Sequence, residues 1–175
     1  KIDIIFVGRL ISNDKGMDKG VRYLIESTKR FNSKCKVVIV GEGPDRKILE
    51  RQNENPNVIF LGKIDNSEVL KMMSLSKVLV LPTVKGDGFP NVIIESFSVG
   101  TPVIATRVGG VMDIVTDRKT GYILDTKNSE QIYKFTKMLI FNKNLWNQFS
   151  KNCKILASKY STKNLSLYDE IFLKL

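Results

Sequence analysis

Six short apolar runs rich in valine and isoleucine alternate with helix-like segments along this chain of 175 residues. The runs cover residues 2–7, 36–40, 58–61, 78–81, 103–105 and 121–124. Continuous β-branched runs are typical of strands that are buried on both faces, and the helices between such strands make parallel crossovers. The pattern therefore predicts an α/β fold, a doubly wound Rossmann-like parallel sheet of about six strands with helices on both faces.

The segments between these runs carry apolar residues at helical spacing. They predict helices over residues 20–31, 44–52, 67–76, 91–99, 129–141, 145–157 and 163–173, and another helix start near Gly109. Pro44 suits the first turn of the second helix. Since no linker or low-complexity tract interrupts the pattern, we expect one domain over residues 1–175, with C-terminal helices from about residue 129.

Composition narrows the possible partners and chemistry. The formal net charge of +10 favours an anionic partner, but the lysines are scattered, with no basic run of five, and we expect no nucleic-acid binding. The sequence has no histidine and no Asp-x-Asp pair, so we predict no metal site and no imidazole base. No apolar stretch approaches the length of a membrane span, and Cys35 and Cys153 resemble buried, reduced residues of a cytoplasmic protein.

The stretch from residue 83 to residue 110 passes from a glycine-bearing loop into a predicted helix. Asp87 falls in the loop, and Glu95 falls about a turn inside the helix. The backbone N–H groups of Gly88, Phe89 and Asn91 are placed to meet an anion at the positive end of this helix. The simpler interpretation of this stretch alone is a strand-to-helix junction with a capping acid.

Glycine also follows strand after strand. Gly8, Gly41, Gly43 and Gly62 all stand just beyond predicted strands. Ligands of doubly wound sheets bind beyond the carboxyl ends of the strands, and glycine lets the backbone approach them closely. Arg9 and a nearby lysine can supply charge for a diphosphate.

Ordered motifs connect these features. They are FVGRL at 6–10, KGVRYLIES at 19–27, VVIVGEGP at 37–44, FLGKI at 60–64, VLVLPT at 78–83, DGFPNVIIES at 87–96, GTPVIATRVGG at 100–110 and GYIL at 121–124. Together they closely resemble the C-terminal, donor-binding half of retaining GT-B glycosyltransferases of the group 1 family (family 4). The resemblance covers almost the whole chain and implies one half of a GT-B fold.

The resemblance implies roles for four catalytic residues. Glu95 matches the second glutamate of the family's E-x7-E segment, which binds the ribose hydroxyls of a nucleotide sugar. Asp87 stands where the first glutamate contacts the transferred sugar, and is one methylene shorter. Arg9 and Lys19 match the cations that bind the diphosphate, and Lys15 remains an alternative to Lys19. The residues implied at the donor site are Gly8, Arg9, Lys15, Lys19, Gly41, Gly43, Lys63, Ile64, Gly88, Phe89, Pro90, Asn91, Val92 and Glu95.

The implied function is donor binding by a retaining glycosyltransferase of the hexosyltransferase type, in polysaccharide or glycolipid biosynthesis. The donor would be a nucleoside diphosphate sugar such as a UDP-sugar or GDP-sugar, with no cofactor or metal required. The acceptor, a glycan or lipid-linked molecule, would bind through an N-terminal half that this chain lacks, so we expect no transfer by the chain alone. We expect a cytoplasmic location, with peripheral contact at the inner membrane face. The alternatives are a non-catalytic or regulatory nucleotide-binding module and a basic protein that contacts membrane or RNA.

Overall fold

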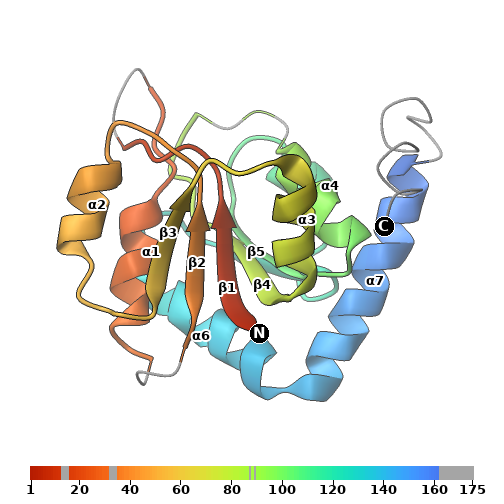
Figure 1. Ribbon diagram of the computed structural model, residues 1–175. Helices are drawn as coiled ribbons and strands as arrows, with labels where there is room; N and C mark the ends of the chain where they lie inside the picture. The colour runs from red at the N-terminus through yellow and green to blue at the C-terminus, as the bar shows by residue number, and fades with distance from the viewer. Residues whose placement is uncertain (13–15, 32–34, 87, 89, 162–175) are drawn as a thin grey trace.

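The computed structural model describes residues 1–12, 16–31, 35–86, 88 and 90–161 (Figure 1). In this part of the chain, six strands form one sheet: β1 (Ile2–Val7), β2 (Val37–Val40), β3 (Val58–Gly62), β4 (Ser76–Leu81), β5 (Val103–Thr106) and β6 (Gly121–Leu124). Their order is β3-β2-β1-β4-β5-β6, and all neighbouring strands are parallel. The predicted doubly wound Rossmann-like sheet is confirmed.

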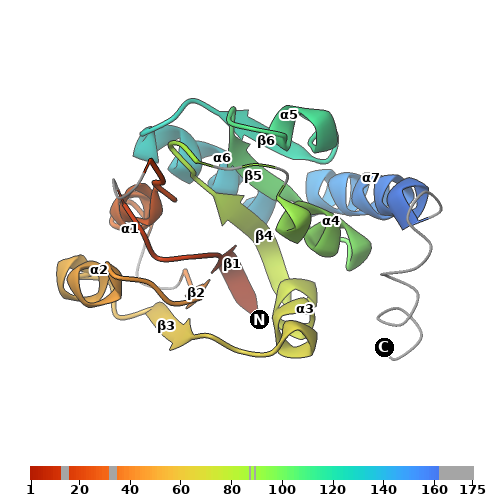
Figure 2. The ribbon, with the colours of Figure 1, turned by 90° about the horizontal axis from the view of Figure 1, so that it is seen from above.

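Helices cover both faces of this sheet (Figure 2). They are α1 (Val21–Thr28), α2 (Arg46–Gln52), α3 (Asn66–Ser74), α4 (Asn91–Ser98), α5 (Val111–Ile114), α6 (Ser129–Phe141) and α7 (Lys143–Ser161). Helix α1 packs beside α6 on one face, whereas α3 and α4 lie on the other, and α7 runs along α4. None of the helices in the described ranges is long and apolar enough to cross a membrane.

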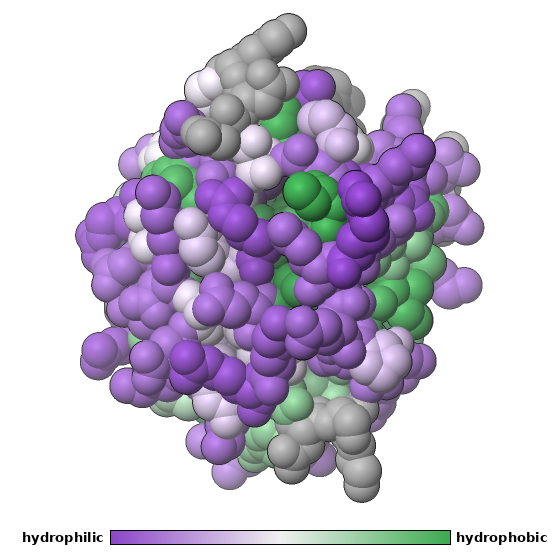
Figure 3. All heavy atoms as spheres, turned by 90° about the vertical axis from the view of Figure 1, so that its left-hand side faces the viewer, coloured by the Kyte–Doolittle hydropathy of each residue, from purple (hydrophilic) through white to green (hydrophobic). Residues whose placement is uncertain are grey.

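The apolar runs form the buried core that their composition predicts. Every residue of β2 and β5 is buried, as expected for strands that are covered by helices on both faces. In the edge strand β3, by contrast, Ile59 and Leu61 are 40% and 37% exposed. Figure 3 shows the side of the molecule that carries α2, which is largely hydrophilic.

The predicted boundary between the third helix and the fourth strand was wrong by two residues. Ser76, placed at the end of the helix from sequence, is the first residue of β4, and α3 ends at Ser74. The Ser76 hydroxyl donates a hydrogen bond to the carbonyl of Met72 (2.7 Å), while its backbone lies opposite Ile2 in the sheet. Strand pairing therefore takes a residue that local periodicity assigns to the helix.

Other helix boundaries also differ from the sequence predictions; α1, for example, ends at Thr28 and not at residue 31. Pro44 lies in the turn before α2, which begins at Arg46. The carboxylate of Asp45 accepts hydrogen bonds from the backbone N–H and the hydroxyl of Ser12, and this keeps Asp45 at the junction with the neighbouring loop. The helix expected over 145–157 is longer, since α7 covers Lys143–Ser161. The helix predicted over 163–173 lies outside the described residues.

The strand order places an open crevice between β1 and β4. Ile4 of β1 is paired with Val37 of β2 on one side and with Val78 of β4 on the other. From β1 the strands follow one another toward β3 on one side, and from β4 they follow one another toward β6 on the other side. The loop after β1 therefore leads to α1 on one face of the sheet, and the loop after β4 leads to α4 on the opposite face (Figure 2). Loops that diverge in this way leave room for a ligand beyond the strand ends.

Candidate functional site

A pocket of about 340 Å³ lies at this divergence point. Its walls come from the loop after β1, the loop after β4 and the first turns of α3 and α4. The lining residues are Phe6, Val7, Gly8, Arg9, Lys19, Asn66, Val69, Leu81, Thr83, Pro90, Asn91, Val92 and Glu95. Seven of the residues predicted for the donor site thus line one pocket, namely Gly8, Arg9, Lys19, Pro90, Asn91, Val92 and Glu95.

Two cations enter the pocket from the loop after β1. The backbone N–H of Gly8 donates to the Val40 carbonyl (3.0 Å), which extends the β1–β2 pairing to the rim of the pocket. Arg9 follows and is exposed. Lys19 is partly buried, and its backbone N–H donates to the carbonyl of Ile11 (2.9 Å). The loop therefore folds back on itself and brings both side chains to the same wall.

The amino end of α4 forms the facing wall. The helix begins at Asn91, and Pro90 stands at its N-cap without a side-chain cap hydrogen bond. Pro90 has no backbone N–H, so any donation from this end of α4 must come from Asn91 and Val92, which also line the pocket. The partial positive charge of a helix amino end therefore faces the same space as the two cations.

Glu95 lies one turn further into α4 and also lines the pocket. The side chain is partly buried, and burial raises the pKa of its carboxyl group. A partly buried carboxylate that lines a pocket together with backbone N–H donors is suited to accept hydrogen bonds from hydroxyl groups of a ligand. The acidic side chain within the apolar run VIIESF therefore faces a cavity.

The glycines after β2 bring two loops together at the rim. A Cβ on Gly41, whose φ is +132°, would lie 1.9 Å from the carbonyl oxygen of Gly8. A Cβ on Gly43 would lie 2.1 Å from the carbonyl oxygen of Leu10. Only glycine fits such backbone contacts, so these two residues support the Gly8–Leu10 segment from behind.

Several predicted site residues lie elsewhere or outside the described ranges. Gly41, Gly43, Lys63 and Ile64 are not among the lining residues of this pocket, and their contact with a nucleobase stays a prediction. Gly88 is exposed, and its carbonyl accepts a hydrogen bond from the Gly110 N–H (2.9 Å). The predictions made for Lys15, Asp87 and Phe89 fall outside the described residues.

Some lining residues were missed from sequence. Thr83 stands two residues beyond the end of β4, and this place at a strand end is a signal in the sequence, although Thr83 was not among the predicted donor-site residues. Asn66 opens α3 and resembles an ordinary helix start. Phe6 and Leu81 form part of the floor and belong to apolar runs, so nothing in sequence separates them from the core.

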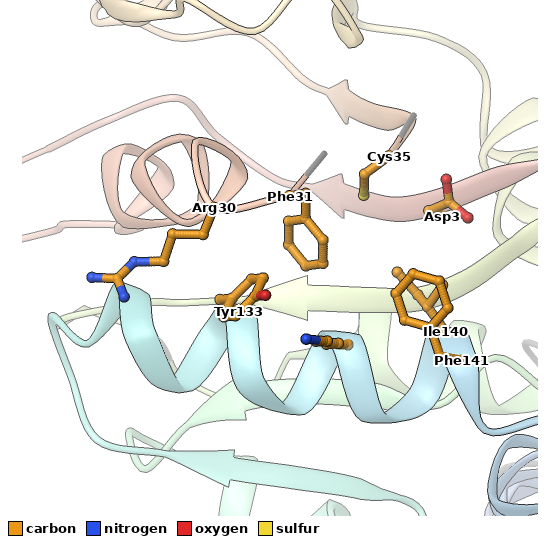
Figure 4. A pocket seen from close by; sticks show the side chains of 8 residues that line it. Asp3, Arg30, Phe31, Cys35, Tyr133, Ile140 and Phe141 are labelled. Carbon is orange, nitrogen blue, oxygen red and sulfur yellow. The ribbon is translucent and has the colours of Figure 1, made fainter. Parts of the chain in front are cut away.

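A larger pocket, of about 460 Å³, lies at the opposite end of the sheet between α1 and α6. Figure 4 shows the aromatic rings of Phe31, Tyr133 and Phe141 gathered there with the Cys35 thiol. Among the residues that the structure describes, none of those predicted for the donor site lines it. In sheets of this topology ligands bind beyond the carboxyl ends of the strands, so the smaller pocket beside Arg9 is the stronger candidate.

Comparison with known proteins gives the family. The family model described as glycosyl transferases group 1 matches residues 1–142. The chain belongs to this family. The fold and the ordered motifs of this group 1 glycosyltransferase chain agree with that assignment, and the resemblance inferred from sequence is confirmed.

Relatives of this group 1 chain are about twice as long. An uncharacterised glycosyltransferase of Methanocaldococcus jannaschii is 26% identical over 180 residues, which cover 100% of this chain and 46% of the relative. The capsular polysaccharide biosynthesis glycosyltransferase CapM of Staphylococcus aureus is 29% identical over 167 residues, which cover 90% of this chain and 42% of CapM. The chain thus spans about half the length of these curated relatives.

Solved structures show the same part of the fold. The C-terminal domain of the group 1 glycosyl transferase LpcC from Francisella tularensis superposes with a TM-score of 0.77 at 27% identity, covering 91% of this chain and 85% of that domain. HepE from Anabaena superposes with a TM-score of 0.79 at 22% identity, covering 90% of this chain and 44% of HepE. The group 1 chain therefore has the fold of the C-terminal half of GT-B enzymes.

Proposed function

We propose that the pocket beside Arg9 binds the nucleoside diphosphate of a sugar donor, and that the whole protein transfers the glycosyl unit with retained anomeric configuration. One observation carries this proposal. Two cations, the amino end of a helix and a partly buried carboxylate line a single pocket at the carboxyl ends of β1 and β4. These groups match the chemical parts of a nucleoside diphosphate, which has two phosphates and a ribose diol.

The cationic wall suits the diphosphate. Arg9 offers a planar fork of N–H donors, and Lys19 offers a compact ammonium group. In glycosyl transfer the diphosphate departs and gains negative charge, so cations held at that position stabilise the transition state more than the ground state. Two cations and a helix amino end supply this charge from the protein itself, and we propose that no metal is required.

The carboxylate suits the ribose. Glu95 lies on the wall formed by α4, where it can accept hydrogen bonds from two neighbouring hydroxyl groups. Asp87 would contact the transferred sugar, following the family pattern. HepE, which has the same fold, was solved in complex with UDP-glucose. UDP is therefore the first probe to use, while GDP and ADP remain open.

The acceptor would bind through another half of the enzyme. The relatives are about twice as long as this chain, and CapM is named for capsular polysaccharide biosynthesis. We propose that the acceptor is a glycan or a lipid-linked molecule. We also propose that the protein is cytoplasmic and makes peripheral contact with the inner face of the membrane. The chain alone should bind donor and transfer no sugar.

Replacement of Glu95 tests the ribose assignment through two opposite effects. Because burial raises the folded-state pKa of Glu95 above its ordinary value of 4.5, the folded protein holds this proton more tightly than the unfolded chain does. Stability therefore falls as the pH rises through that window. We expect Glu95→Gln to have a higher Tm than the wild type at pH 7, with the difference disappearing below about pH 4.5.

The same variant should bind nucleoside diphosphate about tenfold more weakly, because a neutral amide replaces a charged acceptor of two hydroxyl donors. Thermal unfolding at pH 4 and pH 7, and calorimetric titration with UDP, measure the two effects. Glu26→Gln, an exposed glutamate of α1, is the matched control and should change neither. Unchanged UDP affinity in Glu95→Gln would contradict the ribose role.

A further inference from the structure

Asp18 is a buried acidic residue for which the proposed function has no role. It is only 3% exposed, although it stands in the loop between β1 and α1 next to Lys19. A buried carboxylate is retained only where partners compensate its loss of water. The partners of Asp18 show what it holds in place.

The carboxylate of Asp18 organises the start of α1. Its Oδ1 atom accepts a hydrogen bond from the backbone N–H of Gly20 (2.8 Å), and its Oδ2 atom pairs with the Arg22 guanidinium (2.6 Å). Arg22 also donates to Oδ1 (3.3 Å) and to the Tyr23 hydroxyl (3.3 Å). Gly20, which follows Lys19, is thus held by the side chain of Asp18, which precedes Lys19.

The backbone of Asp18 ties this loop to the loop after β4. Its N–H donates to the Lys85 carbonyl (3.0 Å), and its carbonyl accepts from the Val84 N–H (2.8 Å). The two segments form an antiparallel bridge at this point. Beside it, Gly20 packs so closely that a Cβ would lie 1.9 Å from the Pro82 carbonyl oxygen. Asp18 therefore joins the two loops that supply facing walls of the pocket.

Lys19 lies between these two anchors. On one side, the Asp18 backbone is bonded to the loop after β4. On the other side, Gly20 is held by the Asp18 carboxylate and by contact with Pro82. The backbone from which the Lys19 side chain reaches the pocket is thus fixed at both neighbouring residues.

We propose that Asp18 is a positioning residue that sets the place of Lys19 relative to the loop after β4, and so tunes recognition of the second phosphate. This inference rests on the proposed function, since it takes the ligand to be a nucleoside diphosphate. If Asp18 has this role, the preference of the pocket for a diphosphate over a monophosphate depends on the Asp18 carboxylate, although the ligand does not contact it.

The variant Asp18→Asn separates positioning from long-range electrostatics. Removal of a negative charge near an anion site should, by field effects alone, strengthen binding of UDP. Loss of positioning should weaken it. We expect Asp18→Asn to bind UDP about tenfold more weakly, the effect of one lost charge-assisted hydrogen bond, with UMP affinity changed less than about twofold. Glu26→Gln, an exposed acid of α1, removes the same charge and should leave both affinities unchanged.

A double-mutant cycle with Lys19→Ala links the effect to this lysine. Both singles and the double variant are titrated with UDP and UMP, with the fold checked by circular dichroism. If Asp18 acts through Lys19, Asp18→Asn adds little to Lys19→Ala. Additive losses, or equal losses for UDP and UMP, overturn the proposal. Should Asp18→Asn fail to fold, Asp18→Glu keeps the charge and so the field effect, but moves the carboxylate by one methylene. It goes through the same cycle, with the same criteria.

The outcomes distinguish this inference from the proposed function. A wild-type chain that binds neither UDP, GDP nor ADP overturns the proposed function and the premise of the Asp18 role with it. A wild-type preference for UDP over UMP that Asp18→Asn preserves overturns the Asp18 role alone.

Discussion

Alanine at both Arg9 and Lys19 is expected to weaken binding of a nucleoside diphosphate by about 100-fold, since each charge-assisted hydrogen bond to phosphate is worth about 1.5–3 kcal/mol. Both side chains line the pocket at the carboxyl ends of β1 and β4, and they are the two cations among its described lining residues. Each single variant should lose part of this affinity. Titration calorimetry with UDP at low and high salt measures the loss, which should be smaller at high salt because ions screen partly exposed charges.

A matched control removes the same net charge away from the pocket. Arg30 and Lys119 are exposed and do not line it, so Arg30→Ala combined with Lys119→Ala should change UDP affinity by less than about threefold. If the two double variants bind UDP equally well, the diphosphate does not lie between Arg9 and Lys19.

A large loss of stability is expected on substitution of Gly20. This residue has φ +66°, and a Cβ there would lie 1.9 Å from the Pro82 carbonyl oxygen. Alanine at this position would combine left-handed strain with a clash against backbone, neither of which a side-chain rotation can relieve. We expect Gly20→Ala to lower the free energy of unfolding by about 3 kcal/mol or more, as measured by urea denaturation.

Gly88→Ala is the matched control for this prediction. A Cβ added at Gly88 would meet no atom within 4 Å in the described parts of the chain, its two chain neighbours left aside. The substitution should therefore leave the free energy of unfolding within about 0.5 kcal/mol of the wild type. Equal stability of Gly20→Ala and Gly88→Ala would show that the loop before α1 does not pack against Pro82 as described.

The sheet could be predicted from sequence because its strands are buried on both faces. Runs such as residues 36–40 contain little else than β-branched residues, and this composition indicates both the element and its covered position. Boundaries were less predictable. Ser76 joins β4 because it pairs beside Ile2, and a partner so distant in sequence leaves no local signal.

The candidate site likewise contains residues that the sequence predicts and residues that it does not. Arg9, Lys19 and Glu95 could be proposed because each belongs to a motif of adjacent residues. Asp18 could not, because its significance comes from a backbone bridge to Lys85 and from burial, and both arise only when the loops after β1 and β4 meet. A contact between two loops at the carboxyl ends of the strands depends on the fold, so it cannot be predicted from the residues of one loop alone.

The central claim is that this chain carries the nucleoside diphosphate site of a sugar donor. Calorimetric titration of the 175-residue chain with UDP, GDP and ADP, each against its monophosphate, tests it most directly. We predict that at least one diphosphate binds with a dissociation constant of about 1 mM or tighter and in preference to its monophosphate. Failure of all three diphosphates to bind at millimolar concentration would contradict the claim.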